Sequence, residues 1–202
     1  MKIDDLYDDL LIRGDEQLIP EMRALLQSGF YMKVPTGKSL RDILLYCGFS
    51  NEFIDSSIKT IFRNSQPVDD IDRTRISEGD VVGLSGSMPG LVGATLRSGS
   101  HLAAFRRNIS IDPEEPLEGN AEGFIQIRVF NVVLKEAGEF LLDRGIFLKS
   151  ALLVEFFRGR NSDFFDHCQA IILNGTKVDL HPKNLDDLEF SGDMVFLSVK
   201  KK

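Results

Sequence analysis

The apolar positions of the chain fall into short runs separated by turn residues, and two of these runs follow a similar pattern. The first extends from residue 61 to 85 and the second from 171 to 198. In both, an apolar run ends at asparagine, in Asn64-Ser65 and in Asn174-Gly175. Asparagine tolerates the left-handed backbone conformation that a tight hairpin turn requires. Both pairs therefore predict a turn between two strands.

Each segment then ends in a Gly-Asp pair followed by apolar residues at every second position. These residues are Gly79-Asp80, Val82 and Leu84 in the first segment, and Gly192-Asp193, Val195 and Leu197 in the second. A period of two places the apolar side chains on one face of a strand. Each segment is therefore expected to close with a half-buried strand after a Gly-Asp turn.

A helix is predicted upstream of each Asn turn, because a serine precedes an apolar run in both places. Apolar positions 40, 43, 44 and 47 follow helical spacing after Ser39, until Gly48 ends the run. The corresponding run after Ser150 ends near Gly159. Serine is a favoured N-cap, so both serines are expected to cap their helices. Asp42, three residues after Ser39, nearly completes a capping box.

The segments before these helices are expected to form hairpins. In the first half the strands would be 21–26 and 30–34, and in the second half 124–134 and 139–148. Residues 132–142 are also compatible with a helix, and both interpretations stay open. At the N-terminus, apolar residues at positions 3, 6, 7, 10 and 11 have helical spacing and predict a leading helix.

Each half thus runs hairpin, helix, strand, turn and final strand. Through Ser39-Leu40-Arg41-Asp42-Ile43-Leu44, Asn64-Ser65 and Gly79-Asp80-Val81-Val82, the first half resembles the β-grasp (ubiquitin-like) sulfur-carrier proteins of thiamin and molybdopterin synthesis. The second half is similar through Asn174-Gly175 and Gly192-Asp193-Met194-Val195. The resemblance implies an α+β fold of two β-grasp-like domains, each a mixed sheet packed on one helix. The carriers act through a C-terminal Gly-Gly, whereas this chain ends in Val199-Lys200-Lys201-Lys202, so carrier chemistry is not expected.

The pattern predicts three parts along the chain. Residues 1–86 would form the N-terminal domain with its leading helix, and residues 123–202 the C-terminal domain. Between them, residues 87–122 are expected to be a connector rich in glycine and arginine that continues into an acidic, proline-containing linker.

Composition and charge restrict the class of protein. The 202 residues carry 24 basic and 31 acidic side chains, and the net charge of −7 disfavours nucleic acid as a partner. No apolar run is long enough to span a membrane, and the acidic start is unlike a secretory signal, so a cytoplasmic protein is expected. The two cysteines, Cys47 and Cys168, lack the spacing of a metal site and predict reduced thiols. No metal and no cofactor are expected.

The connector supplies the candidate ligand site. Residues 87–111 contain three arginines and no acidic residue, and their glycines would let backbone amides approach an anion. The candidate residues are Gly90, Gly93, Arg97, His101, Arg106 and Arg107. The favoured alternative is a structural connector that packs its apolar residues on a sheet. Catalysis by His101 beside Ser100 is not expected, because no third orienting residue is identifiable. His167 beside Cys168 suggests a metal or thiolate pair, but Cys168 leads into the apolar run 170–173 and is expected to be a buried thiol.

These observations predict a non-catalytic binding or scaffold protein with a protein partner or a second copy of itself. The first alternative is a small-anion or nucleotide-binding protein that uses residues 86–107. The second is an accessory enzyme of sulfur transfer or cofactor synthesis, which rests on the family resemblance alone.

Overall fold

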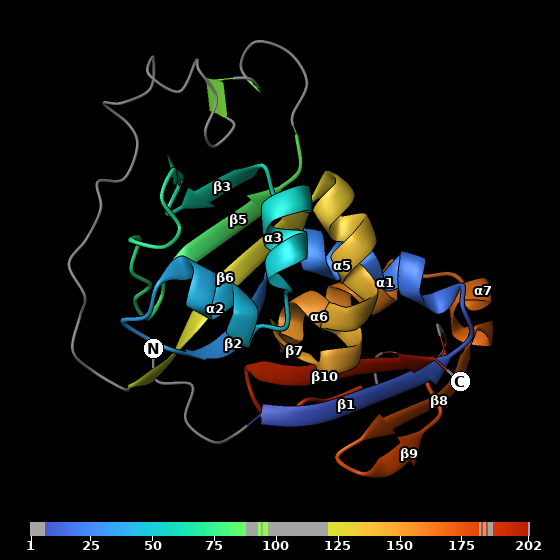
Figure 1. The fold of residues 1–202 in the computed structure, drawn as a ribbon. Coiled ribbons are helices and arrows are strands. Elements are labelled where there is room, and N and C mark those ends of the chain that lie inside the picture. The colour runs from blue at the N-terminus through green and yellow to red at the C-terminus, as the bar shows by residue number, and fades with distance from the viewer. Residues whose placement is uncertain are drawn as a thin grey trace. The chain divides into compact units, whose positions relative to one another are not determined.

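The computed structural model describes residues 7–87, 93, 95–96, 121–181, 183, 185 and 188–201. The chain divides into two compact units. Unit 1 consists of Met1–Phe30 and Gly138–Lys202, and unit 2 of Tyr31–Ala137. Each unit combines helices with strands in a mixed parallel and antiparallel arrangement (Figure 1).

Both halves of the sequence contain the same order of elements: a strand, a helix, a strand, two short helices and three strands. The first half contains β1 (Tyr7–Gly14), α1 (Leu18–Ser28), β2 (Phe30–Pro35), α2 (Leu40–Tyr46), α3 (Asn51–Ser57), β3 (Thr60–Arg63), β4 (Gln66–Pro67) and β5 (Val81–Ser85). The second contains β6 (Glu122–Phe130), α5 (Asn131–Arg144), β7 (Ile146–Lys149), α6 (Ser150–Arg158), α7 (Ser162–Asp166), β8 (Cys168–Leu173), β9 (Thr176–Val178) and β10 (Met194–Lys201). In the first half, the strand and the helix that begin the repeat differ from the leading helix and the strand 21–26 that the sequence predicted.

The sheet of unit 2 has the strand order β4-β3-β5-β6-β2. β5 runs parallel to β6, and β3 is antiparallel to both β4 and β5. Helices α2 and α3 cover one face of these strands (Figure 1). On that face the side chains of Ile61, Leu84 and Val129 are at most 4% exposed. Four strands of this sheet come from the first half of the sequence, and β6 comes from the second.

The strands of unit 1 have the order β7-β10-β1-β8-β9. β1 is parallel to β10 and antiparallel to β8, while β7 pairs antiparallel with β10. Helices α1 and α6 lie on one side of these strands (Figure 1). A strand of the first half, β1, thus lies between two strands of the second half.

This exchange of strands explains why the compact units differ from the predicted domains 1–86 and 123–202. The sheet of each unit includes a strand from the other half, so a boundary drawn between the halves divides both sheets. Each sheet also packs against more helices than the single one predicted, since unit 2 has α2 and α3 and unit 1 has α1, α6 and α7.

The buried side chains of each unit come from both strands and helices. In unit 1, Leu10, Ile12, Leu197 and Phe157 are fully buried. Burying an aliphatic or aromatic side chain of this size contributes about 1.5–3 kcal/mol. The alternation of buried and exposed residues along β1 and β10 leaves the opposite face of the strands half-buried or exposed.

Two predicted elements of the first half are wrong, and in each the backbone follows a different period. The leading helix is the strand β1, where every second residue from Asp8 to Gly14 is buried. The predicted strand 21–26 is part of the helix α1, because Leu18, Met22 and Leu25 lie on one buried helical face. The strand 30–34 of the same predicted hairpin is confirmed as β2.

In the second half, the helical interpretation of 132–142 is confirmed by α5, and the hairpin is wrong. Asn131 has a φ of 54°, a left-handed conformation that ends β6 and starts the helix. The residues before and after this helix belong to the strands β6 and β7.

The predicted turns and closing strands are confirmed. Asn64 and Asn174 both have a φ of 50°, and the next residues, Ser65 and Gly175, have φ values of 69° and 79°. Two successive positive φ values are typical of the type I′ turn that joins twisted antiparallel strands.

Among the predicted N-caps, Ser39 is confirmed, since its Oγ accepts from the Asp42 N–H at 3.1 Å. Ser150 is the first residue of α6 rather than its cap, so that prediction is wrong.

The first Asn turn is fixed by a buried carboxylate at the start of β5. Asn64 Nδ2 donates to Asp80 Oδ1 at 2.7 Å, and the Val81 N–H donates back to Asn64 Oδ1 at 2.9 Å. Asp80 is 5% exposed, and its Oδ2 accepts from Arg63 Nε and from the Ser77 N–H at 2.8 Å each. Every oxygen of this buried carboxylate is therefore hydrogen-bonded.

The second Asn turn has the same arrangement with a carboxylate from the start of the chain. Asn174 Nδ2 donates to Asp8 Oδ1 at 2.7 Å, and the Asp9 N–H donates to Asn174 Oδ1 at 2.8 Å. Asp8 is 2% exposed and also accepts from the N–H and Oγ of Ser191 at 2.7 Å each, and from the Gly192 N–H at 3.3 Å.

The structural counterpart of Asp80 is therefore Asp8, and not the Asp193 that the sequence comparison aligns with it. The reason is the strand order, because in unit 1 it is β1 that lies beside β8 and brings its carboxylate to Asn174.

None of the described helices is long and apolar enough to cross a membrane.

Candidate functional site

Most of the predicted ligand site lies outside the described residues. This applies to Gly90, Arg97, His101, Arg106 and Arg107. Gly93 is described and is a buried residue in helical conformation. The anion site in residues 86–107 and its structural alternative therefore both stay predictions.

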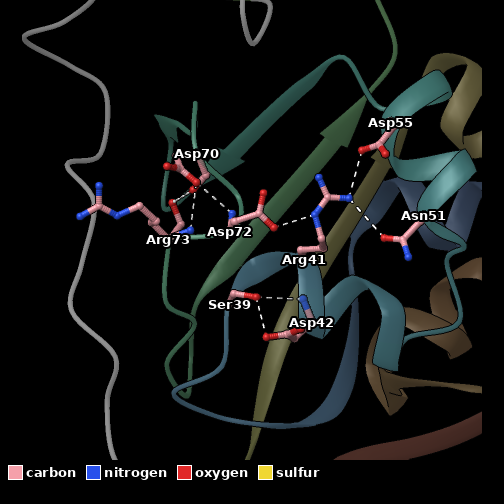
Figure 2. Close-up of polar contacts among 9 residues, drawn as sticks. Ser39, Arg41, Asp42, Asn51, Asp55, Asp70, Asp72 and Arg73 are labelled. Carbon is pink, nitrogen blue, oxygen red and sulfur yellow. Dashed lines mark hydrogen bonds and ion pairs between the residues drawn. The ribbon is translucent and has the colours of Figure 1, made fainter.

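An arginine-centred cluster in unit 2 connects α2, α3 and the loop that follows β4 (Figure 2). Arg41 Nε donates to Asp72 Oδ1 at 2.7 Å, and Arg41 Nη1 donates to Asp55 Oδ1 at 3.0 Å and to Asn51 Oδ1 at 3.3 Å. Hydrogen bonds to Asp72 and Asp55 raise the pKa of the Arg41 guanidinium. The guanidinium is three-quarters buried and remains charged between two carboxylates.

The loop itself is held by Asp70, whose Oδ1 accepts from the Asp72 N–H at 3.1 Å and from the Arg73 N–H at 3.0 Å (Figure 2). The carboxylates of this loop thus make specific bonds, although the Asp72 side chain is 61% exposed.

A cavity of about 390 Å³ adjoins this cluster. Its described lining consists of Arg41, Ile54, Asp55, Ile58, Lys59, Ile61, Asp69, Asp70, Ile71 and Asp72. Four carboxylates face two cations, so the field in the cavity disfavours an anion. Because Arg41 already binds two carboxylates, the cluster is best explained as a tie between α2, α3 and the loop.

A narrow apolar slot lies on the other face of the unit 2 sheet. It encloses about 310 Å³, and its described lining is Phe62 of β3, Gly83 and Ser85 of β5, and Phe130 and Asn131 where β6 meets α5. The register places Phe62 beside Gly83, and Ser85 beside Phe130. A Cβ on Gly83 would lie 3.8 Å from Phe62 Cβ and 4.0 Å from Phe130 Cε2. The absent side chain therefore leaves the space between the two rings open.

One end of the slot is polar. Asn131 Nδ2 donates to Ser85 Oγ at 3.0 Å, and within the described part of the chain neither Asn131 Oδ1 nor the Ser85 hydroxyl proton makes a further bond. Thr60 pairs with Ser85 in the register, is fully buried, and its hydroxyl has no hydrogen-bond partner among the described residues. An unsatisfied buried hydroxyl costs about 1–3 kcal/mol. Thr60 is not part of the described lining of the slot, so the slot combines apolar walls with the unused hydrogen-bonding capacity of Ser85 and Asn131, as ligand pockets do.

The slot was missed from the sequence, although one signal for it was present. Gly83 stands between Val82 and Leu84 in a predicted strand. Glycine weakens a strand interior, and it often marks a place where a ligand or another backbone approaches closely.

The His167–Cys168 pair lies in unit 1 and has the properties of a structural pair. His167 Nδ1 lies 2.8 Å from Asp15 Oδ2, and the hydrogen bond with Asp15 raises the pKa of His167 against the effect of burial. Burial raises the pKa of the Cys168 thiol to about 12, with a smaller contribution from Asp15 and Glu21. A thiol with this pKa is protonated at neutral pH and is a poor nucleophile.

No group of three or more His, Cys, Asp or Glu side chains in the described ranges is placed to hold a metal ion. Of the two cavities described above, the apolar slot of unit 2 is the candidate for ligand binding, because the other is filled with paired charges. Comparison of the chain with protein-family models, with curated proteins and with solved structures gave no match.

Proposed function

We propose that this chain is a non-catalytic binding or scaffold protein built from two β-grasp-like units, and that the slot of unit 2 receives an apolar side chain of a partner polypeptide. The observation that carries this proposal is the open space over Gly83 between Phe62 and Phe130. Two rings facing one gap provide the apolar contact area that anchors a branched or aromatic side chain.

The polar end of the slot supports a polypeptide as the partner. An anchor side chain is attached to a backbone that carries one N–H donor and one C=O acceptor per residue. Asn131 Oδ1 offers a hydrogen-bond acceptor, and the Ser85 hydroxyl proton offers a donor. The two side chains are 46 residues apart in the sequence and are hydrogen-bonded to each other. The acceptor matches a backbone N–H beside the anchor residue, and the donor matches a backbone C=O.

The strand arrangement supports the β-grasp-like part of the proposal. In unit 2 a parallel central pair, β5 and β6, is extended by the antiparallel strands β3 and β4. In unit 1 the parallel pair β1 and β10 is extended by the antiparallel strands β8 and β9. The two units share this pattern together with the paired Asn–Asp turns.

The non-catalytic part rests on the chemistry of the groups that the sequence offered as nucleophiles. Burial raises the pKa of the Cys168 thiol to about 12, and His167 is bonded to Asp15. The guanidinium of Arg41 is engaged by Asp55 and Asp72.

The test uses N-acetyl-leucine methylamide and N-acetyl-phenylalanine methylamide as probes, with amide chemical shifts of the full chain as the readout. We expect millimolar binding with shifts centred on Gly83, Ser85 and Asn131. Gly83→Val fills the slot without backbone strain, because the position is in a strand and an added Cβ makes only ordinary contacts. Binding should therefore disappear while the fold is retained.

Gln126→Val is the matched control, because it adds the same side chain to the same strand face outside the slot. It should leave probe binding unchanged. Absence of shifts at the slot in the wild-type chain, or equal binding by the Gly83→Val variant, would overturn the proposal.

A further inference from the structure

Three aromatic rings form an exposed cluster on the strands of unit 1. Tyr7 of β1, Phe147 of β7 and Phe196 of β10 have centroid separations of 5.0 Å, 4.9 Å and 6.3 Å for the pairs Tyr7–Phe147, Phe147–Phe196 and Tyr7–Phe196. Tyr7 is 45% exposed, and the other two rings are half-buried. The helices α1 and α6 lie on the opposite side of these strands (Figure 1). The cluster is therefore a surface feature and not part of the core of the unit.

The rings are held in a defined position. A Cβ on Gly145 would lie 2.2 Å from Phe196 Cζ, so the Phe196 ring rests directly against the backbone of the residue before β7. Tyr7 meets Phe147 edge-to-face, with an angle of 89° between the ring planes. Such pairs are worth about 0.5–1.5 kcal/mol beyond the burial of their area. A partner would meet this cluster without first having to order it.

The register also places basic side chains on the same face of these strands, with Lys149 beside the rings and the others further along the sheet. The register puts Lys149 in the row of Tyr7, Lys177 in the row of Leu11, and Arg13 opposite Lys200. Within the described ranges, Lys149, Lys177 and Arg13 make no ion pair, whereas Lys200 binds Asp143 at 2.9 Å. We define this surface, the three rings with Arg13, Lys149, Lys177 and Lys200, as the aromatic–basic face.

The charge of the aromatic–basic face is opposite to that of the whole chain. Within the described ranges it carries three cations without an ion pair, Arg13, Lys149 and Lys177, together with the Lys200–Asp143 ion pair and the carboxylate of Asp9, while the protein as a whole has a net charge of −7. A cationic patch on an acidic protein favours a partner of opposite sign at that patch.

We infer that the aromatic–basic face binds a short acidic polypeptide segment that carries aromatic or aliphatic side chains. The rings provide the apolar contact, and the unpaired cations at the rim select carboxylates. The edge-to-face rings do not form the flat platform on which successive bases stack, and the overall charge repels a polyanionic backbone. A short acidic segment is therefore favoured over a single-stranded nucleic acid.

The probe is a fluorescein-labelled hexapeptide of sequence DEFLED, titrated with the full chain and followed by fluorescence anisotropy. We expect saturable binding that weakens with added salt, because the exposed charges are screened. The basic hexapeptide KKFLKK should bind much more weakly. Lys149→Glu should weaken DEFLED binding by roughly three- to tenfold, the range for reversing one exposed charge pair.

Lys38→Glu is the matched control, since it makes the same charge change at an exposed lysine of unit 2. It should leave the affinity within twofold of the wild type. Tyr7→Ser should weaken binding about tenfold or more, as for a central aromatic contact. The Tyr7→Ser variant should retain the fold, because Tyr7 is half exposed. The contact of the Phe196 ring with the Gly145 backbone is unchanged in this variant.

Three results would overturn the inference: no binding of DEFLED, equal binding of KKFLKK, or tighter binding of a twelve-residue oligothymidine. Equal weakening by Lys149→Glu and Lys38→Glu would overturn it as well. Because unit 2 carries the slot and unit 1 the aromatic–basic face, Gly83→Val should leave DEFLED binding unchanged. Failure of one proposal is thus distinguishable from failure of the other.

Discussion

Replacing Asp8 by alanine should destabilise the protein more than almost any other substitution of an acidic residue. The Asp8 carboxylate is 2% exposed and accepts four hydrogen bonds, from Asn174 Nδ2, from the Oγ and N–H of Ser191, and from the Gly192 N–H. A hydrogen bond to a charged group contributes about 1.5–3 kcal/mol, and removing a buried charged partner costs about 3–5 kcal/mol in total, because the bonds are not additive. We therefore expect Asp8→Ala to lose about 3–5 kcal/mol of unfolding free energy.

The assay is urea unfolding followed by far-ultraviolet circular dichroism, with amide exchange in β1 and β10 to assign the loss to unit 1. Each kcal/mol corresponds to about 2–4 °C in Tm for a chain of this size. Asp9→Ala is the matched control, since Asp9 is the next residue, is exposed, and contributes only its backbone N–H and C=O to the turn. It should change stability by less than about 0.5 kcal/mol. Equal effects of the two substitutions would refute the assignment of Asp8 as the counterpart of Asp80.

The same carboxylate predicts a pH dependence. Burial opposes its ionisation, but the hydrogen bonds from Asn174, Ser191 and Gly192 together lower the pKa of Asp8 below its ordinary value of 3.8. A group with a lowered folded-state pKa stabilises the fold above the unfolded value and loses this contribution as the pH falls through the folded pKa. The stability difference between the wild type and Asp8→Ala should therefore be largest near neutral pH and shrink below about pH 4.

Further predictions concern one cap and two titrating groups. Ser39→Ala should cost about 1 kcal/mol in urea unfolding because it removes an N-cap bond, whereas Ser150→Ala, at a position without a capping bond, should cost little. The nuclear magnetic resonance titration of His167 should have its midpoint above 6.5 and move down in Asp15→Asn; stability from this pair is present below 6.5 and is lost as the pH rises through the folded pKa. Because burial raises the pKa of Cys168 to about 12, its alkylation by iodoacetamide at pH 8 should be slower in the folded chain than in urea by roughly a hundredfold or more.

The elements that are bounded by turn-forming or helix-ending residues were predictable from the sequence. Asn64 and Asn174 mark the turns because asparagine tolerates positive φ, and Gly48 and Gly159 follow the helices α2 and α6. The helix α1 was missed because residues 21–26 were assigned to a strand, although Leu18, Met22 and Leu25 have helical spacing. The sequence did not separate the strand and helix interpretations of residues 132–142, because the strand β6 continues into the helix α5 at Asn131 without an intervening loop.

The strand exchange was not predictable from local pattern. β1 and β10 run parallel, and both alternate apolar with polar residues, so either strand satisfies the period expected beside β8. The choice depends on pairing between residues far apart in sequence, such as Asn174 with Asp8. The slot was missed for a related reason, since Phe62, Gly83 and Phe130 come from three strands that only the sheet brings together.

The pairing of β1 with β10 has a consequence for synthesis of the protein on the ribosome. Tyr7 is aligned with Met194, so β1 leaves the exit tunnel long before β10, the strand with which it pairs, has been synthesised. Unit 2 ends at Ala137 and has all of its strands while translation still continues. The nascent chain is therefore expected to complete unit 2 first and to keep β1 available for pairing until β10 emerges.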